Sequence, residues 1–110
     1  MKTTTSKRAL ATNRNVLDSE RAATRAWLIS LGVPEAVAGM HDFSQTIEVK
    51  TSRAGMLVRS SYAYNNRRNA TRHFIRSGEV VAFAESEHNR GYQVFGRGAM
   101  EAADGEDYWT

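Results

Sequence analysis

The chain has 110 residues, with 15 Lys and Arg against 12 Asp and Glu, a net charge of +3 and a pI near 9.6. Apolar residues make up 41% and charged residues 25%, which is typical of one globular domain and excludes a disordered chain. The absence of cysteine excludes disulfides, thiolate nucleophiles and Cys-ligated metal sites. No apolar run reaches the length of a membrane span, so we expect a soluble, cytoplasmic protein with no membrane partner.

The charge is distributed unevenly along the chain. Residues 50–97 contain nine basic and three acidic residues, a net charge of +6, whereas residues 99–110 contain four acidic residues and no basic one. Residues 1–15 are basic and rich in Thr, Ser and Asn, a composition that predicts a flexible arm. We therefore expect a basic arm over 1–15, one α+β domain over 16–98 and an acidic tail over 99–110.

The first expected element is an amphipathic helix over 18–31. Its apolar positions recur at a spacing of four, and two arginines fall on the opposite side of the helix. These positions are Ala23, Trp27 and Leu31, with Arg21 and Arg25 opposite. Gly32 ends the helix, and Pro34 opens a short helical turn over 34–39.

Two β-hairpins are expected next along the chain. From residue 45 apolar and polar side chains alternate, which predicts a strand over 45–50 and a partner over 56–62. Strands over 79–86 and 92–95 form the second hairpin. Together the hairpins predict one antiparallel sheet.

The segment between the hairpins, residues 67–77, allows two interpretations. As a strand it places Arg72, Phe74 and Arg76 on one face, which mixes charged and apolar groups. As a helix it aligns Arg68, Arg72 and Arg76 at a spacing of four, with Asn65 or Asn66 and Gly78 as caps. The helix separates the residue types better, so we predict an N-terminal amphipathic helix, two hairpins and an Arg-rich helix between them.

Arginine dominates the central basic block and indicates a phosphate-binding surface. Its planar guanidinium group binds phosphate through two hydrogen bonds and stacks on bases, while tyrosine rings provide stacking platforms for single strands. The candidate residues are Arg59, Arg67, Arg68, Arg72 and Arg76, with Tyr62 and Tyr64. We therefore expect a small binding protein, without enzymatic activity or cofactor, that engages nucleic acid or a protein that handles it. A basic surface of this kind also suits an acidic protein partner.

The acidic segment 99–110 ends in an aromatic pair, Tyr108 and Trp109. Such a tail can fold back onto a basic surface and compete with phosphate, or its aromatic residues can dock in a partner's pocket. In composition it resembles the C-terminal tails of single-stranded-DNA-binding proteins, which are acidic and end near an aromatic residue. The alternative is a solubilising tail whose Trp109 packs on the domain.

Residues 47–51, Ile-Glu-Val-Lys-Thr, resemble the Glu-x-Lys strand of the PD-(D/E)XK nuclease superfamily. That resemblance implies Asp42 and Glu48 as carboxylate ligands of Mg²⁺ or Mn²⁺ and Lys50 as the catalytic lysine. Only five residues separate Asp42 from Glu48, fewer than the hairpin that usually joins such carboxylates. The other interpretation of the triplet is a charge ladder between neighbouring strands.

A third candidate function is a small inhibitor, of the kind encoded by phages and mobile elements, that acts by protein–protein binding. The three histidines are far apart in the sequence, so we expect His41, His73 and His88 to be surface or capping residues.

Overall fold

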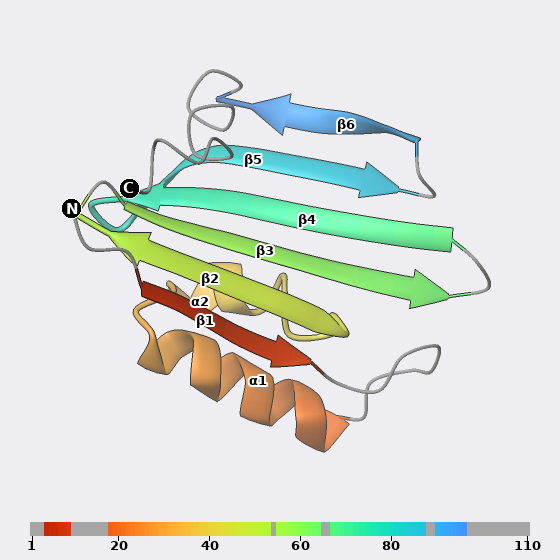
Figure 1. The fold of residues 1–110 in the computed structure, drawn as a ribbon, viewed down its shortest axis with the longest axis horizontal. Coiled ribbons are helices and arrows are strands. Elements are labelled where there is room, and N and C mark those ends of the chain that lie inside the picture. The colour runs from red at the N-terminus through yellow and green to blue at the C-terminus, as the bar shows by residue number, and fades with distance from the viewer. Residues whose placement is uncertain (1–3, 10–17, 54, 65–66, 88–89, 97–110) are drawn as a thin grey trace.

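The structure, a computed structural model, describes residues 4–9, 18–53, 55–64, 67–87 and 90–96. These residues form a six-stranded antiparallel sheet in which each strand pairs with the next along the chain (Figure 1). The strands are β1 (Thr4–Ala9), β2 (Thr46–Ser52), β3 (Gly55–Tyr64), β4 (Arg67–Arg76), β5 (Glu79–Glu87) and β6 (Arg90–Phe95). The Cα radius of gyration is 13.5 Å, as expected for one compact domain of this length.

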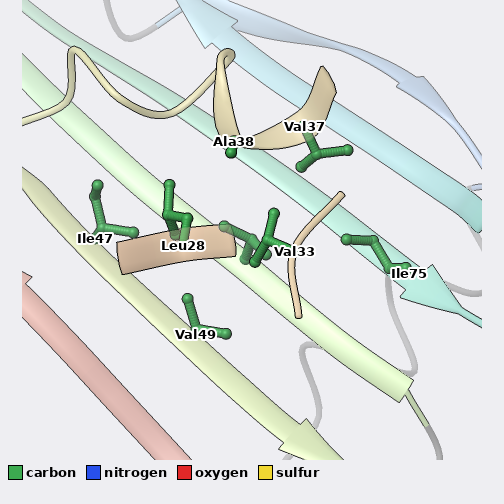
Figure 2. Close-up of a cluster of buried hydrophobic side chains, with 8 residues drawn as sticks. Leu28, Val33, Val37, Ala38, Ile47, Val49 and Ile75 are labelled. Carbon is green, nitrogen blue, oxygen red and sulfur yellow. The ribbon is translucent and has the colours of Figure 1, made fainter. Parts of the chain in front are cut away.

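Two helices, α1 (Asp18–Ser30) and α2 (Glu35–Ala38), are inserted between β1 and β2 and pack on the same face of the sheet (Figures 1 and 2). We call this the helix-side face and the opposite one the far face. The core lies between the helices and the helix-side face, and its buried residues are Leu28, Val33, Val37, Ala38, Ile47, Val49, Val58 and Ile75. This arrangement confirms the expected small α+β domain with an antiparallel sheet.

Helix α1 occupies nearly the expected range and buries part of the expected apolar stripe. Its buried residues are Thr24 and Leu28, whereas Ala23 is exposed. Arg21 and Arg25 were expected on the solvent side but contact Asp42 in the loop before β2. Trp27 and Leu31 of the expected apolar stripe are partly buried and pack against the core.

The expected basic arm over 1–15 is wrong for the residues that the structure describes. Thr4–Ala9 forms strand β1, which pairs with all but the last residue of β2. Its Arg8 side chain lies on the helix-side face and donates from Nε to Thr24 Oγ1 at 3.0 Å. Backbone pairing with β2 orders this polar segment, although its side chains contribute little to the core. The remainder of the arm and the tail over 99–110 lie outside the described residues.

The expected Arg-rich helix over 67–77 is also wrong, because these residues form most of β4. β4 pairs along its length with β3 and along most of it with β5. Arginines at a spacing of four share a face in a strand as well as in a helix, so their alignment does not distinguish the two. The presence of a strand on each side decides the conformation.

Both expected hairpins are present, and a further one joins β4 to β5. Its loop is Ser77 and Gly78, with φ values of 54° and 80°. Positive φ at both loop residues is the feature of a two-residue type I′ hairpin turn. Gly78, which was expected to cap a helix, therefore lies in a tight turn between strands.

Candidate functional site

A row of charged side chains crosses the far face from β1 to β4. The strand register places Lys7 beside Glu48, Glu48 beside Arg59, and Arg59 beside Arg72. The row is on the far face because the neighbours of Glu48 in the chain, Ile47 and Val49, belong to the core on the other side. Four strands thus contribute one side chain each to a continuous line of charge.

Glu48 is the acidic member of this row and is held by two basic neighbours. The Lys7 Nζ atom lies 3.5 Å from its Oε2, and Arg59 Nη2 donates to its Oε1. Burial alone raises the pKa of Glu48, but the hydrogen bond and charge of Arg59, with help from Lys50 and Lys7, hold it below its ordinary value. Glu48 is therefore ionised near neutral pH and neutralises only part of the cationic row.

Further basic side chains share the far face. Lys50 follows Glu48 by two residues on β2, and Arg76 lies on β4 with its guanidinium carbon 5.2 Å from the centre of the Phe74 ring. Glu79 pairs directly with Arg76 and is the second carboxylate on this face. The described far face carries five basic and two acidic side chains. The basic ones are Lys7, Lys50, Arg59, Arg72 and Arg76.

The structure therefore brings Arg59, Arg72 and Arg76 of the expected phosphate-binding set onto one face. The other members of the set, Tyr62, Tyr64, Arg67 and Arg68, belong to β3 and β4, but their side chains lie outside what the structure describes. Tyr108 and Trp109 also lie outside it. The only aromatic ring among the described far-face side chains is Phe74, which is fully buried.

The carboxylates expected to share a metal ion lie on opposite sides of the sheet. Glu48 and Lys50 do share the far face, as the alternation predicts, but Asp42 contacts helix α1 on the helix-side face. The structure therefore does not bring Asp42 to Glu48 and Lys50. Among the described residues no group of three or more potential metal ligands occurs. The Glu48 contacts match the charge ladder that was the other interpretation of the triplet.

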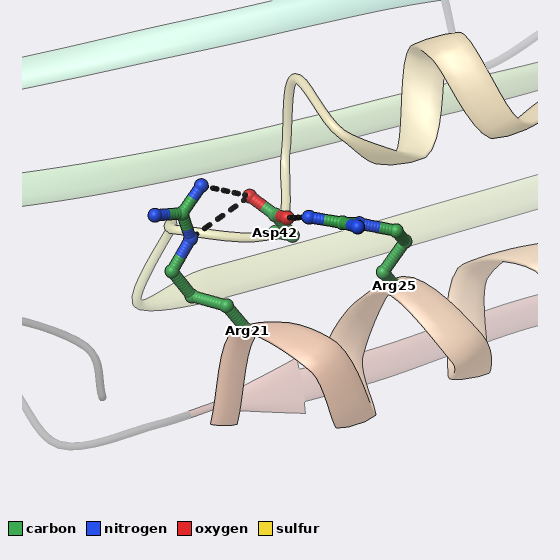
Figure 3. A network of polar contacts seen from close by, with 3 residues as sticks. All are labelled: Arg21, Arg25 and Asp42. Carbon is green, nitrogen blue, oxygen red and sulfur yellow. Dashed lines mark hydrogen bonds and ion pairs between the residues drawn. The ribbon is translucent and has the colours of Figure 1, made fainter. Parts of the chain in front are cut away.

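Asp42 is instead the centre of a buried ion-pair cluster (Figure 3). Arg25 donates from Nε and Nη2 to its Oδ2 at 3.1 and 2.7 Å, and Arg21 donates from the same atoms to its Oδ1 at 3.4 Å. The carboxylate has no exposed surface, whereas the arginine side chains are 41% and 46% exposed. Two guanidinium groups thus compensate one buried charge and fasten α1 to the loop before β2.

His41, the residue before Asp42, points toward the sheet and joins two residues of neighbouring strands. Its Nδ1 lies 2.6 Å from Ser60 Oγ on β3, and its Nε2 lies 2.7 Å from His73 Nδ1 on β4. All three side chains are buried, with at most 5% exposure. The expectation that His41 and His73 are surface or capping residues is therefore wrong, and His88 lies outside the described residues.

Burial determines the protonation of this histidine pair. Burial, aided by repulsion from His73, lowers the pKa of His41 to about 3, and burial lowers the pKa of His73 to about 4. Both rings are neutral at neutral pH, and two tautomeric arrangements satisfy both hydrogen bonds. Either Ser60 donates to His41 and His41 to His73, or each donation is reversed. This chain of hydrogen bonds joins the loop before β2 to β3 and β4.

Sequence reasoning missed this pair because the two histidines are 32 residues apart and only the tertiary fold brings them together. The alternation in β4 was the available signal, since a strand places His73 beside Ile75 on the face opposite Arg72. Within the described part of the chain, no helix is long and apolar enough to cross a membrane. Comparison with known proteins found no matching family model, no matching curated protein and no matching solved structure.

Proposed function

We propose that the protein binds nucleic acid through the basic far face of its sheet. The observation that carries this proposal is a set of five basic side chains from four neighbouring strands, which share the described part of the far face with two carboxylates. A phosphate backbone is a line of negative charges, and a line of cationic side chains across several strands is the complementary surface.

The dimensions of the row suit a phosphate backbone. Neighbouring strands are about 4.8 Å apart, so the row from Lys7 to Arg72 extends over about 14 Å. Phosphates of one B-DNA strand follow each other at about 3.4 Å along the axis, so several of them fit along this distance. Glu48 fixes the side chains of Lys7 and Arg59 and thereby orients the row before a ligand binds.

The described far face favours contacts to phosphate over contacts to bases. Its only aromatic ring, Phe74, is buried, so it offers no stacking platform. Contacts to phosphate carry no sequence information by themselves. We therefore propose that the protein binds nucleic acid by electrostatic attraction. This binding has little sequence preference and depends strongly on the salt concentration, and no catalytic step is part of the proposal.

The test compares the salt dependence of oligonucleotide binding for two variants that each lose one positive charge. Arg72→Gln removes a cation from the far face, whereas Arg53→Gln removes an exposed cation from the turn between β2 and β3. For a single-stranded oligonucleotide we expect Arg72→Gln to reduce the slope of log affinity against log salt by about 0.7, the value for one lost phosphate contact. Arg53→Gln should leave the slope unchanged. The double variant Lys50→Gln, Arg72→Gln should lose about twice as much as Arg72→Gln alone.

Equal slopes for the Arg72→Gln and Arg53→Gln variants would overturn the proposed surface. Thermal unfolding of each variant shows whether the fold is retained, so a loss of binding is not confused with a loss of structure. A stoichiometric complex with an acidic protein, together with no salt-dependent binding of oligonucleotides, would instead support the inhibitor or protein-binding alternative.

A further inference from the structure

Four apolar side chains on the far face are fully protected from water. Leu57, Phe74, Ala82 and Ala84 are each at most 1% exposed. They belong to β3, β4 and β5, and none of them is part of the core cluster beneath the helices. We call these four residues the far-face apolar patch.

The helices do not explain this burial, because α1 and α2 both lie on the helix-side face (Figures 1 and 2). The guanidinium of Arg76 lies over the ring of Phe74, which accounts for part of the cover of one residue. Apolar side chains on a sheet that has no second layer keep substantial exposure to water. The burial of the patch therefore needs a cover other than the helices.

The end of β6 brings the chain directly to this patch. Gly96 has a φ of +68°, a conformation that favours glycine, and a Cβ atom added there would lie 2.2 Å from the carbonyl oxygen of Val81 and 2.9 Å from Ala82 Cβ. The backbone at Gly96 thus lies against Ala82, a member of the patch, and leaves no room for a side chain on that side. Gly96, the last residue that the structure describes, is therefore beside the patch, and fourteen residues follow it in the sequence.

The sequence after Gly96 is complementary to the far face in charge and in chemistry. Residues 99–110 have four carboxylates and no basic residue, and they end in the aromatic pair Tyr108 and Trp109. The far face combines a net positive charge with an apolar patch. Carboxylates suit the basic side chains, and aromatic rings suit the apolar patch.

We propose that residues 99–110 bind the far face of their own chain and cover the far-face apolar patch. An oligonucleotide must then displace this segment before it reaches the basic side chains, which makes the segment an internal competitor of polyanions. The proposal that the segment binds is based on the burial of the far-face apolar patch, the position of Gly96 and the opposite charges of the segment and the far face. The proposal that it competes with polyanions rests in addition on the proposed function.

The chain has no cysteine, so a single spin label can be placed at one introduced site. With a label on Thr110→Cys, we expect the methyl signals of Leu57, Ala82 and Ala84 to lose more intensity than those of Val49, Val58 and Ile75 on the helix-side face. A label on Ile29→Cys, an exposed position of α1, is the matched control and should reverse this order. High salt should weaken the effect of the label at residue 110, because it screens the charges.

With the label at residue 110, a loss at the helix-side methyl groups that equals or exceeds the loss at the far-face ones, or no loss at either set, overturns the proposal. Loss that appears when the spin label and the isotope label are on different chains shows binding to a second copy, and also overturns it. The spectrum of each labelled protein shows whether the fold is intact before the intensities are compared.

The competition has its own test on the full chain. The variant Glu101→Gln, Asp104→Asn, Glu106→Gln removes three charges from the segment, and the control Asp18→Asn, Glu35→Gln, Glu85→Gln removes three exposed charges that do not lie on the far face. We expect the first variant to bind a single-stranded oligonucleotide on the order of tenfold more tightly than the control, since both have the same net charge. Equal affinities refute the competition. If neither variant binds, the proposed function fails while the methyl intensities still decide whether the segment binds.

Discussion

Acidification should destabilise this protein through its buried histidine pair. The pKa values of His41 and His73 are about 3 and about 4 in the folded chain, compared with about 6.5 in an unfolded chain. Because folding lowers both pKa values, the contribution of the two neutral histidines to stability is complete above about pH 6.5. It is lost as the pH falls toward the pKa values of the folded chain. Below about pH 6.5 the unfolded chain binds protons that the folded chain cannot accept.

The size of the effect follows from the difference in pKa. At about pH 5 the pH is about 1.5 units below the unfolded pKa of each histidine, whereas the folded chain keeps both rings neutral. Each histidine therefore lowers the free energy of unfolding by about 2 kcal/mol. The pair together should lower the free energy of unfolding by about 4 kcal/mol relative to about pH 8. This is a large fraction of the 5 to 15 kcal/mol that is usual for a domain. Depression of the Glu48 pKa acts in the same direction, but at lower pH.

Urea unfolding at a series of pH values measures this dependence. Near pH 5 the free energy of unfolding should change by about 3 kcal/mol per pH unit, the slope for two protons. The variant His73→Gln should reduce the slope by half, whatever its stability at high pH. In the intact protein, the imidazole signals of His41 and His73 should not shift between about pH 8 and about pH 5 in an NMR titration. Titration of either ring near pH 6.5 in the folded state would refute the reasoning.

The remaining predictions concern stability and are measured by thermal or denaturant unfolding. Arg25→Gln should cost about 2 kcal/mol and Arg21→Gln about 1 kcal/mol, and removal of both should cost about 3 to 5 kcal/mol because buried Asp42 keeps no cationic partner. Equal costs for the two single variants would contradict the difference in their hydrogen-bond lengths. Gly55→Ala should cost on the order of 3 kcal/mol, because its φ is +142° and the added Cβ would lie 2.6 Å from a carbonyl oxygen. A neutral result would show that the turn adopts another conformation. Phe74→Ala should cost about 3 to 5 kcal/mol, the usual effect of emptying a fully buried aromatic site, and a cost typical of surface positions would show that the far-face apolar patch is open to water.

The candidate site was only partly predictable from the sequence. The abundance of arginine in the central block indicated a basic surface, and the alternation around Glu48 correctly placed Lys50 on the same face as that carboxylate. The partners of these residues were not predictable, because Lys7 reaches Glu48 from a segment whose composition indicates an arm. The pairing of His41 with His73 likewise depends on a contact between distant parts of the chain.

The sequence by itself determined the elements whose pattern is local. Alternating side chains predicted β2 and β3, and a helical spacing predicted the range of α1. Tertiary structure decided β1 and β4, whose polar and mixed patterns suit more than one conformation. A strand obtains its backbone hydrogen bonds from its neighbours in the sheet, so its stability depends on residues that a local pattern does not contain. The pairing of each strand with its neighbours also decides on which face of the sheet each arginine lies, and therefore where the basic surface is.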